Sequence, residues 1–106
     1  MTFNELVEKV RERAKATDVS GIDFLAVQIN ITGDNGGVFY LEAKDGNVNV
    51  EPYDYHDRSC GITLNQDNFI KLMNGKLDPV AAFTTKKLTV DGDVGKALEF
   101  SKLIKK

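Results

Sequence analysis

The segment FLAVQINITGDNGGVFYLEAKDGNVNVE, residues 24–51, contains three stretches of alternating apolar and polar residues. In the first stretch, aliphatic side chains occupy every odd position from Leu25 to Ile31, which is the period of a half-buried strand. TGDNGG supplies turn residues after it, and Asp45-Gly46 is a strong two-residue hairpin signal. The segment therefore predicts a three-strand meander at residues 24–31, 38–43 and 47–51.

Two further stretches alternate in the same way. SCGITL, residues 59–64, places Cys60, Ile62 and Leu64 in phase, and KKLTVDG, residues 86–92, does the same for Leu88 and Val90. Strands of this kind have one dry face and one largely wet face, which is typical of an antiparallel sheet with helices on one side. The predicted fold class is α+β, with a five-stranded, mainly antiparallel sheet and helices packed on one face.

The helices that cover this sheet begin at recognisable capping residues. Thr2 and Glu5 form a capping box before an amphipathic helix at 2–16. Three further helices are predicted at 65–75, 78–85 and 93–106, and their first residues, Asn65, Asp78 and Asp93, are the predicted N-caps. The helix at 78–85 is very short, and we expect its residues Val80, Ala81 and Phe83 to face inward.

Length and composition limit the class of protein. The 106 residues, 42% hydrophobic and 28% charged, are predicted to form one globular domain, residues 1–106, without a signal peptide or membrane span. Cys60 is alone, so no internal disulfide can form and we expect a reducing compartment, the cytoplasm. The net charge of −2 argues against general nucleic-acid binding.

Charge is nevertheless distributed unevenly along the chain. Residues 71–106 carry 8 basic and 4 acidic groups, whereas residues 1–70 carry 6 and 12. The lysines of the last third either solvate helix faces or meet phosphates on a headgroup or ligand. Both interpretations stay open at this point, and the second predicts transient contact with an anionic membrane surface.

Candidate catalytic groups are few. His56 lies beside Asp54 and Asp57, which would allow a metal or acid/base cluster, but adjacent loop residues rarely converge on one ion, so a solvated turn between strands is the preferred interpretation. Cys60 is in phase with buried positions and is expected to be an inert apolar thiol. VDGDVGKA, residues 90–97, lacks a phosphate-loop pattern, so a tight turn and a helix cap at Asp93 explain it. We therefore expect a protein without catalytic activity, cofactor or metal ion.

The remaining signal is the set of apolar residues in the short helices of the last third. They are core residues, or they leave a cleft, since several short helices pack on a sheet less completely than two long ones.

The run ITLNQDNFIKLMNGKLDPVAAFTTKKLTVDGDVGKALEFSKL, residues 62–103, resembles the signature half of the sterol carrier protein-2 family. The matching features are a strand, D-x-F-x-x-L-M-x-G-K, D-P-x-x-A-F, K-L-x-V-x-G-D and a closing A-L-x-x-x-x-L helix. The order of elements in the front half matches too. The resemblance implies the sheet-and-helix fold described above and non-catalytic binding of fatty acids, fatty acyl-CoAs, sterols or other lipids in an apolar tunnel.

The resemblance also implies candidate site residues. The candidate lipid-binding residues occupy the matching motif positions or their inward neighbours: Phe69, Leu72, Met73, Ala82, Phe83, Leu88, Val90, Leu98, Leu103 and Ile104. Four lysines are candidate headgroup contacts: Lys76, Lys86, Lys87 and Lys102. We expect a monomer or weak homodimer without stable membrane insertion.

One residue departs from the family pattern, because Lys86 stands where relatives commonly have glycine. The chain also ends without a peroxisomal tripeptide, so a freestanding cytoplasmic protein is expected. Two alternatives remain: a protein-interaction or dimerisation module of the same fold, and an enzyme that uses His56 with Asp54 or Asp57.

Overall fold

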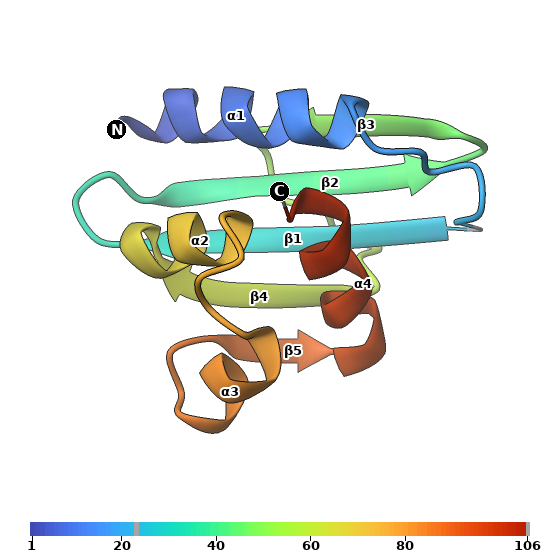
Figure 1. Ribbon diagram of the computed structural model, residues 1–106. Coiled ribbons are helices and arrows are strands. Elements are labelled where there is room, and N and C mark those ends of the chain that lie inside the picture. The colour runs from blue at the N-terminus through green and yellow to red at the C-terminus, as the bar shows by residue number, and fades with distance from the viewer. Residues whose placement is uncertain (23, 106) are drawn as a thin grey trace.

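A five-stranded sheet carries helices on one face in the computed structural model, which describes residues 1–22 and 24–105 (Figure 1). The strands are β1 (Phe24–Thr32), β2 (Gly37–Lys44), β3 (Asn47–Glu51), β4 (Cys60–Asn65) and β5 (Thr89–Gly92). The helices are α1 (Phe3–Lys15), α2 (Gln66–Met73), α3 (Pro79–Thr84) and α4 (Val94–Ile104). The predicted α+β class and the five strands are confirmed.

The strand order is β3-β2-β1-β4-β5, with β1 at the centre. The β1–β2, β2–β3 and β4–β5 pairs are antiparallel, and β1 and β4 are parallel. The sheet is therefore mixed, although mainly antiparallel as predicted. The parallel pair arises because the chain returns from β3 through residues 52–59 before it enters β4 beside β1.

Apolar residues form continuous rows across the sheet on the helix side. One row runs from Phe39 through Ile29 and Ile62 to Val90, as the strand registers require. Aromatic rings from the sheet and from α2 pack against each other in this core: the centroids of Phe39 and Phe69 are 5.9 Å apart. Burial of these side chains supplies the main driving force for folding.

The predicted caps are present in the helices. Thr2 and Glu5 form the reciprocal capping box of α1. Asn65, Asp78 and Asp93 each accept a backbone hydrogen bond at the start of α2, α3 and α4. These bonds satisfy amide groups that have no partner within a helix. The short local signals therefore placed the helix starts correctly, and the helix ends differ from expectation by one or two residues.

Two expectations for the last third are wrong. Ala82 is the buried residue of α3, whereas Val80, Ala81 and Phe83 are exposed, because the six-residue helix docks on the sheet through a single small side chain. β5 begins at Thr89 instead of residue 86, since Lys86 adopts a left-handed backbone conformation with φ of 63° that interrupts the extended chain.

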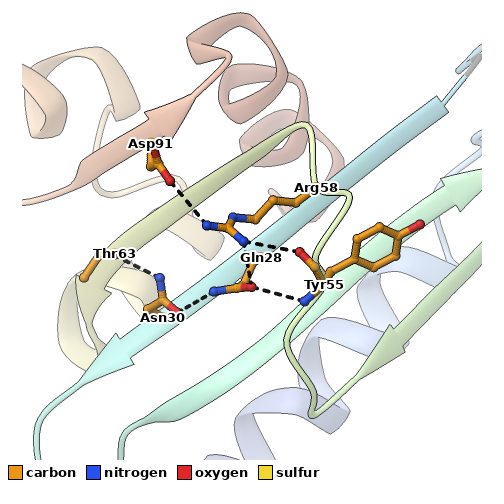
Figure 2. A network of polar contacts seen from close by, with 6 residues as sticks. All are labelled: Gln28, Asn30, Tyr55, Arg58, Thr63 and Asp91. Atoms are coloured by element: carbon orange, nitrogen blue, oxygen red, sulfur yellow. Dashed lines mark hydrogen bonds and ion pairs between the residues drawn. The ribbon is translucent and has the colours of Figure 1, made fainter.

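The opposite face of the sheet is polar and is crossed by the loop of residues 52–59 (Figure 2). Gln28 Oε1 accepts hydrogen bonds from the Tyr55 backbone amide and from Arg58, and Arg58 also pairs with Asp91 at 3.3 Å. The guanidinium lies over Gly61, where a Cβ atom would be 3.3 Å from Arg58 Nε. This network fixes the loop on the face that lacks helices.

Candidate functional site

An apolar cavity lies between the β4–β5 end of the sheet and helices α3 and α4. Its volume is about 70 Å³. It is lined almost wholly by carbon atoms, from Ile62, Leu72, Pro79, Val80, Phe83, Leu88, Val90, Val94, Ala97, Leu98 and Ser101. A methylene-sized group needs roughly 30 Å³, about the share of one water molecule in the liquid, so the cavity holds two or three such groups.

The cavity occurs here because the covering elements are short. β5 has four residues and α3 has six, and α3 contributes only Ala82 to the buried core. At the other end of the sheet, the thirteen-residue α1 buries Leu6 and Val10 completely. The interior is thus incompletely filled under α3, where the covering helix is shortest.

A second, more open pocket of about 590 Å³ adjoins the cavity. The two share five lining residues, Leu72, Pro79, Val80, Leu98 and Ser101. The second pocket adds charge from the α2–α3 turn and the end of α4, through Lys76, Asp78, Lys102 and Lys105. An apolar compartment therefore opens into a wider one with a basic rim.

Ser101 is the buried polar side chain between the two compartments. It is 6% exposed, and its hydroxyl donates a 2.7 Å hydrogen bond to the Leu98 carbonyl. The donor is satisfied within α4, which leaves the hydroxyl oxygen able to accept a hydrogen bond.

The predicted lining residues divide into two groups. Those that line the cavity are Leu72, Phe83, Leu88, Val90 and Leu98. The others, which belong to the buried core and do not line it, are Phe69, Met73, Ala82, Leu103 and Ile104. Phe69 illustrates the reason: its ring lies 5.9 Å from Phe39 and 6.4 Å from Phe100, in the filled part of the interior.

The predicted headgroup lysines are also divided. Lys76 and Lys102 line the second pocket together, and Lys105, which the sequence did not single out, joins them. Lys86 lines a groove beside β5 that shares Phe83, Leu88 and Val90 with the cavity, and Lys87 lines none of these pockets. Lys86 therefore lies at a different edge of the cavity from Lys76 and Lys102.

The cavity-lining residues that sequence reasoning did not propose as ligand contacts are Ile62, Pro79, Val80, Val94, Ala97 and Ser101. Ile62 could have been found, since it lies in phase with Leu64 on β4 and opposite Val90 on β5. Ser101 carried no signal of its own, although it follows Ala97 by four residues and so shares a helix face with it.

The titratable groups outside this cavity offer little for catalysis. The His56 side chain is 92% exposed and its Nε2 lies 3.9 Å from Asp54 Oδ2. Burial raises the pKa of the Cys60 thiol to about 11, so the reactive thiolate is disfavoured. The hydrogen bond to Glu42 raises the pKa of Tyr55 to about 12. Within residues 1–22 and 24–105, no group of three His, Cys, Asp or Glu side chains could hold a metal ion.

A mixed sheet covered on one side by helices, with an apolar cavity beneath the shortest of them, defines a small-ligand-binding domain of the α+β class. The chain belongs to the SCP-2 sterol transfer family, whose model matches residues 3–105. Domains of this family generally bind and transfer lipids. The predicted family is confirmed.

Known proteins agree with this assignment. Over 80 residues, the chain is 34% identical to hydroxysteroid dehydrogenase-like protein 2 of Bos taurus, covering 73% of this chain and 19% of that protein. Human sterol carrier protein 2 is 28% identical over 105 residues, covering 97% of this chain and 19% of that protein. The chain thus spans about a fifth of the length of these curated relatives.

A solved structure shares the fold. The solution structure of palmitated SCP2L2 from Aedes aegypti superposes with a TM-score of 0.72 at 19% identity, covering 98% of this chain and 95% of that one. In the described part of this chain, no helix combines the length and apolar content needed to cross a membrane.

Proposed function

We propose that this chain is a non-catalytic lipid-binding domain that takes one acyl chain or a comparable apolar body, such as a sterol, between the sheet and helices α3 and α4. The observation that carries the proposal is the carbon-lined cavity that opens into a basic pocket. The SCP-2 family assignment and the palmitated form of the similar Aedes aegypti protein support it.

The size of the cavity determines how a ligand would enter. Twelve methylenes occupy roughly 360 Å³ at about 30 Å³ each, which exceeds the 70 Å³ cavity several-fold. A chain of that length would need part of the adjoining pocket or an outward shift of α3. The half-exposed Val80 and Phe83 side chains would then cover the ligand, because they project from α3 at the cavity.

The energetics favour loose specificity. Burying about twelve methylenes at ~0.8 kcal/mol each would contribute about 10 kcal/mol before binding costs, on the scale of micromolar affinity. We propose that an anionic head, a fatty-acid carboxylate or the phosphates of an acyl-CoA, would lie near Lys76 and Lys102, and that Lys105 would assist them. The single, buried thiol of Cys60 fits a reducing compartment, which we propose to be the cytoplasm.

Displacement of a fluorescent fatty acid by saturated acids of increasing length tests the proposal. We expect the affinity to rise about fourfold per added methylene and then to level off when the cavity and its extension are full. A Lys76→Gln/Lys102→Gln variant should weaken binding of the acids but not of alcohols of equal chain length, whereas Lys9→Gln on α1 should change neither. No displacement at any chain length would reject the proposal.

A second candidate function is a protein-interaction or dimerisation module. It is favoured by one observation, that the corresponding region makes up only 19% of hydroxysteroid dehydrogenase-like protein 2 of Bos taurus. In this case the exposed apolar side chains near α3 would close on a partner chain. Light scattering over a range of protein concentrations separates the two candidates, because a dimerisation module would be dimeric at low micromolar concentration and a lipid carrier would be a monomer or at most a weak dimer there.

A further inference from the structure

Ser101 is the one buried residue with a polar side chain in the described part of the chain. It lines the apolar cavity, where each of the other lining residues has a hydrocarbon side chain. A hydroxyl in such surroundings costs free energy unless it is hydrogen-bonded, and alanine would fill the same position with a higher helix propensity. One turn earlier α4 has alanine, since Ala97 lines the same cavity. Packing alone therefore does not account for the hydroxyl of Ser101.

The protein uses the hydrogen of this hydroxyl but not its oxygen. Ser101 Oγ donates a 2.7 Å hydrogen bond to the Leu98 carbonyl, three residues earlier in α4. That bond fixes the direction of the hydroxyl hydrogen and leaves two lone pairs on the oxygen. Among the described residues, no side chain or backbone group donates a hydrogen bond to them. Ser101 thus presents a buried acceptor at the wall of the cavity.

Water is a poor partner for this acceptor. A buried water molecule is typically held by about three hydrogen bonds, and carbon-lined cavities tend to stay dry. Around this cavity, Ser101 supplies the polar side-chain atom and the other lining side chains supply carbon. A partner for the oxygen would therefore come from a ligand that fills the apolar space and carries its own donor.

The chemistry of the acceptor limits the group that can bind it. A carboxylate would lose its hydration without gaining a donor, and an ammonium group would be buried without a counter-ion. A ketone or ester oxygen only accepts, so Ser101 would have to give up its bond to Leu98 in order to donate to it. A neutral hydroxyl donates directly, which makes it the group that fits best.

Helix α4 arranges the cavity, the acceptor and the basic rim in order along its length. Ala97 lines the cavity alone, Ser101 lines both compartments, and Lys105 lines the second pocket alone. The three residues are spaced by four, so each lies roughly 6 Å further along the helix axis than the one before and on the same side. A chain lying along α4 would meet an apolar wall, then an acceptor, then positive charge.

We propose that Ser101 is a specificity-determining residue that accepts a hydrogen bond from a hydroxyl on the acyl chain of the ligand. The inference rests on the proposed lipid-binding function and narrows its ligand class to fatty acids hydroxylated near the methyl end. The cavity of about 70 Å³ beside Ser101 holds two or three methylene-sized groups, which places the hydroxyl on the third or fourth carbon from that end. The carboxylate at the other end of the chain would lie toward the lysines of the second pocket.

Competition with a fluorescent fatty acid tests the inference. The quantity measured is the ratio of two affinities, that of hexadecanoic acid hydroxylated on the third carbon from the methyl end to that of hexadecanoic acid itself. Ser101→Ala should lower this ratio about tenfold, because the buried hydroxyl of the ligand loses its acceptor. The same ratio for a mid-chain hydroxy acid should change less than about twofold, since that hydroxyl would lie in the open pocket and stay hydrated.

Two variants and one further ligand separate recognition from packing. Ser101→Thr retains the hydroxyl and should retain the preference for the hydroxy acid, although its extra methyl group should weaken binding of both acids. Ser59→Ala removes a half-buried serine that lines none of the pockets described and should leave the ratio unchanged. An acid with a ketone at the same carbon should not depend on Ser101, because it cannot donate. Circular dichroism checks that each variant folds.

Moving the hydroxyl along α4 gives an independent readout. In a Ser101→Ala/Ala97→Ser variant the acceptor lies one turn deeper, so the preferred hydroxyl should move toward the methyl end of the chain. An unchanged ratio in Ser101→Ala, or an equal loss for the ketone, would overturn the role of Ser101 and leave the proposed function standing. Failure of every acid to bind the wild-type protein, hexadecanoic acid included, would overturn both.

Discussion

Filling the cavity with protein atoms should weaken ligand binding and at the same time stabilise the fold. Leu98 is the position of choice, because it is half-buried on α4 and lines both the cavity and the adjoining pocket. A Leu98→Phe substitution adds about three carbon atoms, which matches the two or three methylene-sized groups that a 70 Å³ cavity accommodates.

The volume of the cavity determines both the expected loss of ligand affinity and the expected gain in stability. A ligand excluded from the cavity loses the burial of two or three methylenes, about 2 kcal/mol at ~0.8 kcal/mol each, which weakens its affinity roughly 30-fold. In the ligand-free variant, the added carbon atoms of the phenylalanine are themselves buried in the cavity, and part of that free energy stabilises the fold. Cavity filling commonly adds about 0.5–2 kcal/mol, so we expect the free energy of unfolding of Leu98→Phe to rise by about 1 kcal/mol.

Urea unfolding of the ligand-free protein and displacement of a fluorescent fatty acid measure the two effects. The control is Ile70→Phe on α2, a similar enlargement at a half-buried residue that lines none of the pockets described. It should leave the affinity unchanged. Wild-type affinity in Leu98→Phe, with the variant folded, would mean that the ligand does not use this cavity and would refute the reasoning.

Three further predictions concern stability. Lys86→Gly should raise the free energy of unfolding by about 0.5 kcal/mol in a urea titration. The left-handed φ of 63° costs a lysine about 1–2 kcal/mol, and part of the relief is offset because glycine loses more conformational entropy on folding. Lys87→Gly is the control and should lower stability in the same titration. The raised pKa of Cys60 stabilises the folded state fully below pH 9 and progressively less as the pH rises to about 11, so Cys60→Ala should flatten the stability profile over that interval. Arg13→Ala should cost about 1–2 kcal/mol in thermal or urea unfolding, because the Arg13 guanidinium donates to the Met73 carbonyl at the end of α2.

Local chemistry explains why so much of the fold could be predicted. The alternation in Phe24–Thr32 and the Asp45-Gly46 turn each specify structure over a few residues, and the register between β2 and β3 follows from that turn. The N-caps at Asn65 and Asp78 act within one helical turn. These interactions are short in range, so a sequence pattern is enough to find them.

Local sequence does not determine the direction of β4 relative to β1 or which side of α3 is buried. Nothing in SCGITL distinguishes a strand parallel to β1 from an antiparallel one, since the path of residues 52–59 across the polar face makes that choice. For α3, five of the six residues in PVAAFT are apolar, so the pattern does not distinguish a buried face from an exposed one, and only the fold places Ala82 in the core and leaves Val80 and Phe83 exposed.

The sequence by itself determined the strands, the helix starts and the family of this protein, because periodicity, caps and motif spacing are properties of neighbouring residues. Only the tertiary structure decided which of the apolar residues fill the core and which surround space. Phe69 and Leu98 are both apolar residues at helix positions for which the sequence predicts ligand contact. In the structure, Phe69 packs against two other phenylalanine rings, whereas Leu98 borders the cavity. The physical reason is that packing density depends on how closely whole elements approach one another, and that distance is set by side chains far apart in the chain.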